Sequence, residues 1–127
     1  MHVVIAGGGV VGAQLALALR AAGHEVSVVE VDAGRATALS AQGLTVVTGN
    51  ACVAAHLEAA GALRTDVLVA CTGSDEENLV ISLLAKRHLE VPRVVSRLND
   101  DADRWLFEDS WGVDATVSLA SALLAAI

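Results

Sequence analysis

The residues best placed to do chemistry stand near the start of the chain. Gly7, Gly9 and Gly12 follow an apolar run at Gly-x-Gly-x-x-Gly spacing, and a second apolar run ends in Glu30. This arrangement is typical of a strand–turn–helix unit that binds a dinucleotide. Gly7 would permit a sharp turn, Gly9 a close approach of the backbone to a pyrophosphate, and Gly12 close packing of the helix on the sheet. The expected chemistry is therefore phosphate binding at a helix N-terminus.

The carboxylate of Glu30 is the second candidate. At the end of a second strand it can accept hydrogen bonds from the hydroxyls of an adenosine ribose. It would also repel a 2′-phosphate, so we expect NAD(H), ATP or ADP rather than NADP(H). Val31 follows it in the chain. Asp32 either assists at this position or caps the next helix.

Two further loops are expected to border the same crevice. Asn50 and Ala51 follow the third apolar run. An asparagine amide both donates and accepts, so Asn50 either contacts an adenine or is a turn residue that caps the next helix. Thr72, Gly73 and Ser74 follow the fourth apolar run. The glycine permits a close approach, and the two hydroxyls can reach phosphate or ribose oxygens.

The charged residues near these loops have more than one interpretation. Asp75, Glu76 and Glu77 would open a helix, with Ser74 or Asp75 as its N-cap. Negative charge suits that end of a helix, so we expect a structural role and a poor second phosphate site. Arg97 ends the fifth apolar run. It either pairs with a phosphate or carboxylate of a ligand or interface, or forms a surface salt bridge.

Composition argues against several classes of protein. The chain has 127 residues, a formal net charge of −7 and only 2% aromatic residues. We therefore expect neither a polyanion-binding surface nor a stacking platform for nucleic acid. Cys52 and Cys71 set no disulfide framework, and no histidine stands at metal-ligand spacing. No apolar run approaches the ~18 residues of a membrane span, and Met1 leads into the first strand without a basic leader segment.

Strand-like and helix-like runs alternate along the whole chain. We expect strands at residues 3–6, 25–30, 44–48, 66–71, 93–97 and 115–117. We expect helices at residues 10–22, 33–42, 53–60, 74–88, 100–109 and from 118 or 121 to 127. This alternation predicts one α/β domain over residues 1–127, a three-layer, Rossmann-like, doubly wound parallel sheet of six strands in the order 3-2-1-4-5-6. The ligand crevice would lie at the carboxyl ends of strands one and four.

The last expected helix is amphipathic. Leu119, Leu123, Leu124 and Ile127 have little left in the chain to cover them. The helix either packs on a partner or a missing lobe outside this chain, or folds back on its own sheet.

Several motifs together carry a resemblance to one family of domains. They are residues 4–12, 23–26, 30–32, 49–51 and 57–61, the block from Asp66 to Asn78, and the run from Ser96 to Asn99. With these motifs the chain resembles the RCK N-terminal domain, also called the TrkA-N or KTN domain, from Val3 to about Val117. The block from Asp66 to Asn78, taken with Arg97, is the most specific part of the resemblance.

The resemblance implies a regulatory rather than a catalytic role. Domains of this family sense nucleotides for bacterial potassium uptake systems and some potassium channels, and bind NAD(H), ATP or ADP. They act at the inner face of the cell membrane, in the cytoplasm, as peripheral partners of a transmembrane potassium transporter subunit. They form homodimers and higher rings that change shape with the ligand.

The motifs and the resemblance together give one set of nucleotide-binding candidates. It comprises Gly7, Gly9, Val10, Val11, Gly12, Glu30, Val31, Asn50, Ala51, Thr72, Gly73, Ser74 and Arg97. No catalytic residue and no metal ligand is expected. The chain departs from the family in having Asn50 where Asp is common and Asp100 where Pro is frequent. By the resemblance, we expect residues 1–127 to lack the C-terminal lobe that members of the family commonly have.

An NAD-dependent oxidoreductase, or the cofactor-binding half of one, is the alternative. It would share the glycine turn. Against it, no Ser-His-Asp or Cys-His pair stands out, and the one lysine, Lys86, lies near the end of an expected helix. No part of the chain is left for a substrate domain.

Overall fold

A parallel sheet of six strands forms the centre of the molecule. The computed structural model describes residues 1–107 and 112–127. The strand order is β3-β2-β1-β4-β5-β6, and each neighbouring pair is parallel. The strands are β1 (His2–Ala6), β2 (Glu25–Glu30), β3 (Thr45–Thr48), β4 (Val67–Ala70), β5 (Arg93–Leu98) and β6 (Ala115–Ser118). The order predicted from the alternation of elements is confirmed.

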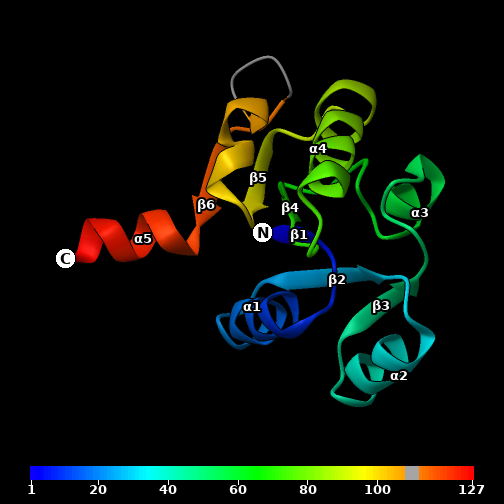
Figure 1. Cartoon of the computed structure of the whole chain (residues 1–127). Helices are drawn as coiled ribbons and strands as arrows, with labels where there is room; N and C mark the ends of the chain where they lie inside the picture. The colour runs from blue at the N-terminus through cyan, green and yellow to red at the C-terminus, as the bar shows by residue number, and fades with distance from the viewer. Residues whose placement is uncertain (108–111) are drawn as a thin grey trace.

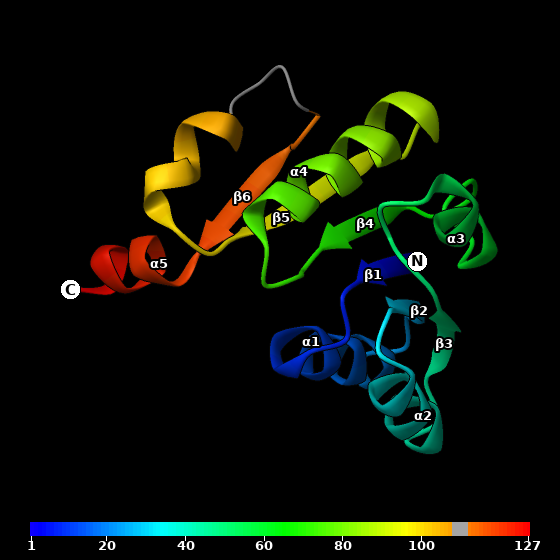
Figure 2. The same ribbon diagram turned by 45° about the vertical axis from the view of Figure 1, so that its right-hand side comes forward.

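Helices pack on both faces of the sheet, which makes three layers (Figures 1 and 2). On one face, α1 (Val10–Ala21) and α2 (Ala33–Ala41) enclose a core that includes Val3, Ile5 and Val28. On the other, α3 (Ala54–Ala59) and α4 (Asp75–Leu83) enclose a core that includes Val4 and Val94. Strands buried from both sides explain why the apolar runs of the sequence are nearly continuous rather than alternating.

Two helical segments differ in kind from the expected α-helices. The helix expected over residues 74–88 consists of α4 and a π-helical turn, η1 (Leu84–His88). The helix expected over residues 100–109 is a 3₁₀ segment, η2 (Asp101–Phe107), and its last two expected residues lie outside the described part of the chain. Three acidic residues in four positions at 100–103 favour local turn bonds over a regular helix, as in the bond from Ala102 N to Asp100 Oδ1 at 3.0 Å.

The caps of the helices follow the predicted residues. Ser74 Oγ accepts a hydrogen bond from Glu77 N at 3.2 Å at the start of α4. Asp32 Oδ2 accepts from Arg35 N at 3.2 Å at the start of α2. The N-cap interpretation of Asp32 is therefore confirmed, and Ser74 rather than Asp75 caps α4.

The last helix, α5 (Leu119–Ala126), extends away from the body of the molecule (Figures 1 and 2). Ser118 caps it by accepting from Ser121 N at 3.0 Å. None of its residues is buried, so it does not fold back on its own sheet in this structure. Among the described residues, no helix is long and apolar enough to cross a membrane.

Candidate functional site

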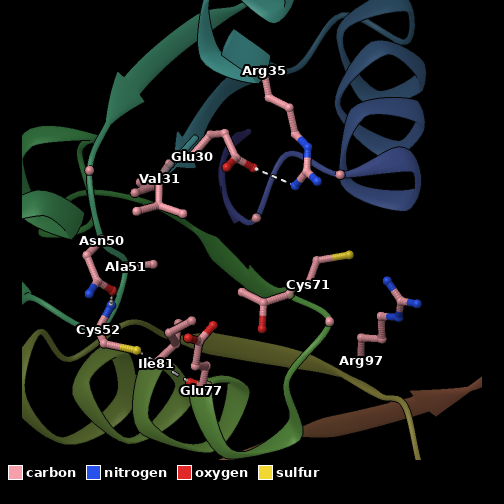
Figure 3. A pocket seen from close by; sticks show the side chains of 16 residues that line it. Glu30, Val31, Arg35, Asn50, Ala51, Cys52, Cys71, Glu77, Ile81 and Arg97 are labelled. Atoms are coloured by element: carbon pink, nitrogen blue, oxygen red, sulfur yellow. Dashed lines mark hydrogen bonds and ion pairs between the residues drawn. The ribbon is translucent and has the colours of Figure 1, made fainter. Parts of the chain in front are cut away.

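A pocket of about 380 Å³ opens where the carboxyl ends of β1 to β4 meet. Its size is in the range of small-molecule sites. Figure 3 shows Asn50 and Arg97 on opposite sides of it, with Glu30 between them. The lining residues are Gly7, Gly9, Val29, Glu30, Val31, Arg35, Gly49, Asn50, Ala51, Cys52, Cys71, Thr72, Gly73, Glu77, Ile81 and Arg97.

Most of the predicted nucleotide-binding residues line this pocket, and four do not. Val10 borders a separate hollow beside α2, and Val11 borders an apolar groove beside α1. Gly12 is buried behind the turn. Ser74 is half-buried, and its hydroxyl caps α4.

The glycine turn is tightly packed at three of its four glycines. Gly7 has φ +110°, and an added Cβ would lie 2.8 Å from the carbonyl oxygen of Cys71. At Gly12 an added Cβ would lie 1.9 Å from the carbonyl oxygen of Gly7. The nearest neighbour of that Cβ is therefore the turn itself, because the Ile5 side chain of the sheet would lie farther from it, at 3.5 Å. At Gly8, for which no role was predicted, an added Cβ would lie 2.6 Å from Leu39 Cδ1.

The N-terminus of α1 is open to an anion. Gly9 is its N-cap and supplies no side-chain hydrogen bond, and the first turn contains no acidic residue. An added Cβ on Gly9 would meet nothing within 4 Å. The unpaired N–H groups and the positive end of the helix dipole are thus available to a phosphate. By contrast, α4 has a side-chain cap and three acidic residues in its first turn.

Glu30 is buried, with 4% of its surface exposed. Its Oε1 accepts from Gly8 N at 2.9 Å, and its Oε2 accepts from Asp32 N at 2.7 Å. Each carboxylate oxygen can accept more than one hydrogen bond, so both remain able to accept from a ligand hydroxyl. The two backbone donors fix the carboxylate in place before any ligand arrives.

Arg35 is a lining residue that the sequence motifs did not indicate. Its guanidinium Nη1 lies 4.0 Å from Glu30 Oε1 (Figure 3). Its Nε lies 4.0 Å from Asp32 Oδ2. The side chain is 62% exposed, so this is a weak ion pair. Arg35 lies in the first turn of α2. That position would have predicted a place in the pocket lining only if the direction in which α2 leaves the sheet had been known.

Asn50 lies in a loop that its own hydrogen bonds hold in shape. Its Oδ1 accepts from Cys52 N at 2.9 Å, and its backbone N donates to His56 Nδ1 at 2.8 Å. Asn50 is therefore a turn residue, but it does not cap the next helix as the alternative expected, because the N-cap of α3 is Val53. A contact of Asn50 with adenine stays a prediction. His56, for which no role was expected, packs against Gly49 so closely that an added Cβ would lie 2.7 Å from its Nδ1.

The opposite rim of the pocket is organised by a buried residue, Asn78. Its Oδ1 accepts from Thr72 N at 2.9 Å and lies 2.8 Å from Thr72 Oγ1. Its Nδ2 donates to Thr72 O and to Arg97 O, each at 3.1 Å. Asn78 therefore joins the ends of β4 and β5. The Thr72 hydroxyl is already engaged in this network, while an added Cβ on Gly73 would meet nothing within 4 Å.

Asp75 has a structural role, as predicted. Its Oδ1 accepts from Asn99 N at 2.7 Å, and its Oδ2 accepts from Asp100 N at 2.9 Å. Burial acts to raise the pKa of Asp75, but the hydrogen bonds from the backbone of Asn99 and Asp100 and from the side chains of Asp103 and Asn99 together outweigh it and lower the pKa. This carboxylate holds the loop after β5.

Arg97 and Cys71 lie together at the end of the crevice opposite Asn50. Burial raises the pKa of the Cys71 thiol, and the charge of Arg97 beside it partly offsets that rise. Among the described residues no carboxylate pairs with Arg97, so the surface salt bridge considered for it is not formed there. No group of three or more His, Cys, Asp or Glu residues in the described ranges could hold a metal ion.

Comparison with protein families gives one match that spans most of the chain. The family model for the TrkA-N domain matches residues 3–119. The Trk system potassium uptake protein TrkA of Mycobacterium tuberculosis (strain ATCC 25618 / H37Rv) is 42% identical over 118 residues, which cover 93% of this chain and 54% of the relative. A TrkA homolog of Methanothermobacter thermautotrophicus is 35% identical over 122 residues, with the same coverage. The chain thus spans about half the length of these relatives.

Solved structures with the same fold extend the comparison. The TrkA-N domain of the inner membrane protein ybaL from Escherichia coli superposes with a TM-score of 0.88 at 21% identity, covering 98% of this chain and 92% of that one. The NAD(P)-binding domain of an exopolyphosphatase-related protein from Archaeoglobus fulgidus gives 0.83 at 25% identity, with the same coverage. The GsuK channel bound to NAD gives 0.80 at 21% identity, covering 91% of this chain and 21% of that one.

Proposed function

The chain belongs to the TrkA-N domain family, and from that premise we propose that it is a nucleotide-binding regulatory module of a potassium uptake system. The observation that carries this proposal is the pairing of two features in one pocket. The uncapped N-terminus of α1 offers N–H groups to a phosphate, and Glu30 is fixed to accept from a ribose. The names of the relatives, potassium uptake proteins, support the physiological context.

NAD(H), ATP and ADP are the proposed ligands. All three carry an adenosine and a pyrophosphate, which match the two features of the pocket. NADP(H) would place a 2′-phosphate beside the buried carboxylate of Glu30, and the exposed Arg35 offsets this repulsion only weakly. A domain at 25% identity described as NAD(P)-binding, together with the NAD-bound channel of the same fold, supports a dinucleotide or a related nucleotide as the ligand.

The bound nucleotide acts in this proposal as a signal rather than as a reagent. The carboxylate of Glu30, a buried acid in the pocket lining, is engaged by two backbone N–H groups, and the buried carboxylate of Asp75 is engaged by two more at the loop after β5. A regulatory ligand must bind one assembly state more tightly than another. Steady consumption of NADH with a small carbonyl substrate would favour the oxidoreductase alternative instead.

The proposed partner is a transmembrane potassium transporter subunit, with this domain as a peripheral component on the cytoplasmic face of the membrane. The domain would act as a homodimer within a larger ring. The exposed apolar helix α5 supports an assembly, because it buries none of its residues within its own chain.

Isothermal titration calorimetry with NADH, NAD, ATP, ADP and NADPH tests the proposal on wild type, Glu30→Ala and Glu25→Ala. Glu25 is the matched control, since it lies at the opposite, exposed end of the same strand. We expect wild type and Glu25→Ala to bind at least one of the first four ligands below millimolar concentration. We expect Glu30→Ala to bind that ligand about tenfold more weakly, the effect of losing roughly 1.4 kcal/mol. Tightest binding of NADPH, or no binding below millimolar, would refute the assignment of the pocket.

A further inference from the structure

A second hollow, here called the α1–α2 hollow, lies beside the nucleotide pocket, between the start of α1 and the side of α2. It has a volume of about 320 Å³. Its lining residues are Gly8, Gly9, Val10, Ala13, Arg35, Ala38 and Leu39. Two of them, Gly9 and Arg35, also line the nucleotide pocket, so the two cavities meet there. A ligand in the pocket can therefore extend a substituent into the hollow, and the lining determines which substituent is accepted.

The lining of the α1–α2 hollow favours an anion. Arg35 is the only charged side chain among the described residues that line it. The hollow also includes the start of α1, where Gly9 is the N-cap, the first turn contains no acidic residue and the helix dipole is positive. The remaining lining residues are apolar or glycine, so the lining contributes no acid that would repel a negative charge.

The guanidinium of Arg35 is available to a ligand. Its Nη1 lies 4.0 Å from Glu30 Oε1 and its Nε lies 4.0 Å from Asp32 Oδ2, distances too long for hydrogen bonds. The side chain is 62% exposed, and Figure 3 shows it reaching from α2 toward the carboxylate of Glu30. Within the described chain its side-chain N–H groups are therefore not used in hydrogen bonds. The forked N–H groups of an arginine match the oxygens of a phosphate.

Glu30 places one position of a bound ribose beside this hollow. In the dinucleotide-binding arrangement, the acid at the end of the second strand accepts a hydrogen bond from the ribose 2′-hydroxyl. Oε1 is the carboxylate oxygen on the side of the hollow, because it accepts from Gly8 N at 2.9 Å and lies within 4.0 Å of Arg35 Nη1. A phosphate on the ribose 2′-oxygen would therefore lie between the negative charge of Glu30 and the positive charge of Arg35.

We propose that the α1–α2 hollow is a subsite for a phosphate on the ribose 2′-oxygen, in which Arg35 is the binding cation and Glu30 excludes the phosphate. In the wild type the buried, fixed carboxylate prevails over the exposed guanidinium, so nucleotides without a 2′-phosphate are preferred. Removing the charge of Glu30 leaves Arg35 and the α1 dipole, so the same pocket then accepts 2′-phosphorylated nucleotides, NADP(H) among them. This inference rests on the proposed nucleotide site.

Calorimetry with matched pairs of nucleotides tests the subsite. The pairs are NADH with NADPH, and ADP with its 2′-phosphorylated analogue, and the members of each pair differ only in the 2′-phosphate. The measured quantity is the Kd of the phosphorylated member divided by the Kd of the other, so effects common to both members cancel. The variants are Glu30→Gln, Arg35→Ala, the double variant and Arg64→Ala. Arg64→Ala is the matched control, because it removes the same charge from an exposed arginine in a hollow at the amino ends of β1 to β3.

We expect the Kd ratio of the wild type to exceed one. Glu30→Gln should lower the ratio about tenfold, the effect of removing roughly 1.4 kcal/mol of repulsion. Arg35→Ala should raise the ratio about threefold in either background, on the scale of an exposed ion pair. Arg64→Ala should leave the ratio unchanged. Because the Arg35 side chain is exposed, Arg35→Ala in the wild-type background decides the matter even where Glu30→Gln does not fold.

The possible failures are distinguishable. If the wild type binds neither member of either pair below millimolar concentration, the proposed function itself fails and the inference fails with it. If nucleotides bind but folded Glu30→Gln keeps the wild-type ratio, Glu30 does not exclude the phosphate. If Arg35→Ala keeps the wild-type ratio, or shifts it no more than Arg64→Ala does, the α1–α2 hollow is not a phosphate subsite. Either of the last two results would overturn the inference and leave the nucleotide site standing.

Discussion

Replacing Asn78 by alanine should loosen the rim of the pocket, because this one side chain pairs with three main-chain groups. They are Thr72 N–H, Thr72 C=O and Arg97 C=O, at 2.9, 3.1 and 3.1 Å. A buried polar group left unpaired costs about 1–3 kcal/mol. The rim is only partly buried, and water can reach some of these groups, so the lower end of that range, about 1 kcal/mol, applies to each of the three groups. We therefore expect Asn78→Ala to lose about 3 kcal/mol of unfolding free energy in total.

Ser82→Ala is the matched control for Asn78→Ala. Ser82 is equally buried and lies one turn further along α4, but its hydroxyl makes a single bond, to Asn78 O at 2.7 Å. Its loss should cost about 1 kcal/mol. Urea unfolding followed by circular dichroism gives both free energies, and calorimetry gives the nucleotide Kd, which should rise about tenfold for Asn78→Ala and stay unchanged for Ser82→Ala. Equal destabilisation of the two variants, or an unchanged Kd for Asn78→Ala, would contradict the assignment of Asn78 as the tie between β4 and β5.

Two further predictions concern the glycine turn and acid stability. Gly12→Ala should lower the unfolding free energy by about 3 kcal/mol and abolish nucleotide binding, because its Cβ would lie 1.9 Å from Gly7 O. Gly9→Ala, whose Cβ would meet nothing within 4 Å, should weaken nucleotide binding but change the unfolding free energy by less than about 0.5 kcal/mol. Urea titration measures the unfolding free energies, and calorimetry measures the binding. Burial acts to raise the pKa of Asp114, but the bonds from Lys86 Nζ and Val94 N outweigh it and lower that pKa. Its contribution to stability is therefore complete above the ordinary aspartate pKa of about 3.9 and is lost as pH falls through the lower folded value. Urea midpoints between pH 2 and 7 should show a shallower acid loss for Asp114→Asn; an unchanged slope would rule out this contribution.

The strand order was predictable because it depends on features that repeat along the chain. Apolar runs alternate with helical stretches, and a right-handed crossover leaves few ways to arrange them. The caps at Asp32, Ser74 and Ser118 were predictable for a similar reason, since a capping bond joins residues only three apart.

The contacts within the site were less predictable because they join distant segments. Asn78 stands in a helix whose apolar face could be identified, but its bond to Arg97 O depends on how closely β4 and β5 approach. The tightest neighbour of Gly12 depends on where the Gly7 carbonyl points, which the motif does not specify. The path of α5 away from the sheet could not be predicted from the composition of the helix, because an apolar helix can pack equally well on its own sheet or on a partner.

The way Glu30 is held has a consequence for how this domain can evolve. The groups that fix its carboxylate are the peptide N–H groups of Gly8 and Asp32, which every residue except proline provides. Asp32 can therefore drift in sequence without moving the carboxylate that would recognise a ribose. The other end of the crevice depends on the side chains of Asn78 and Arg97, where a single substitution changes what the rim can do. The position of the Glu30 carboxylate is thus robust to a change of side chain at residue 32, while the far rim is free to diverge between descendants of one ancestral domain.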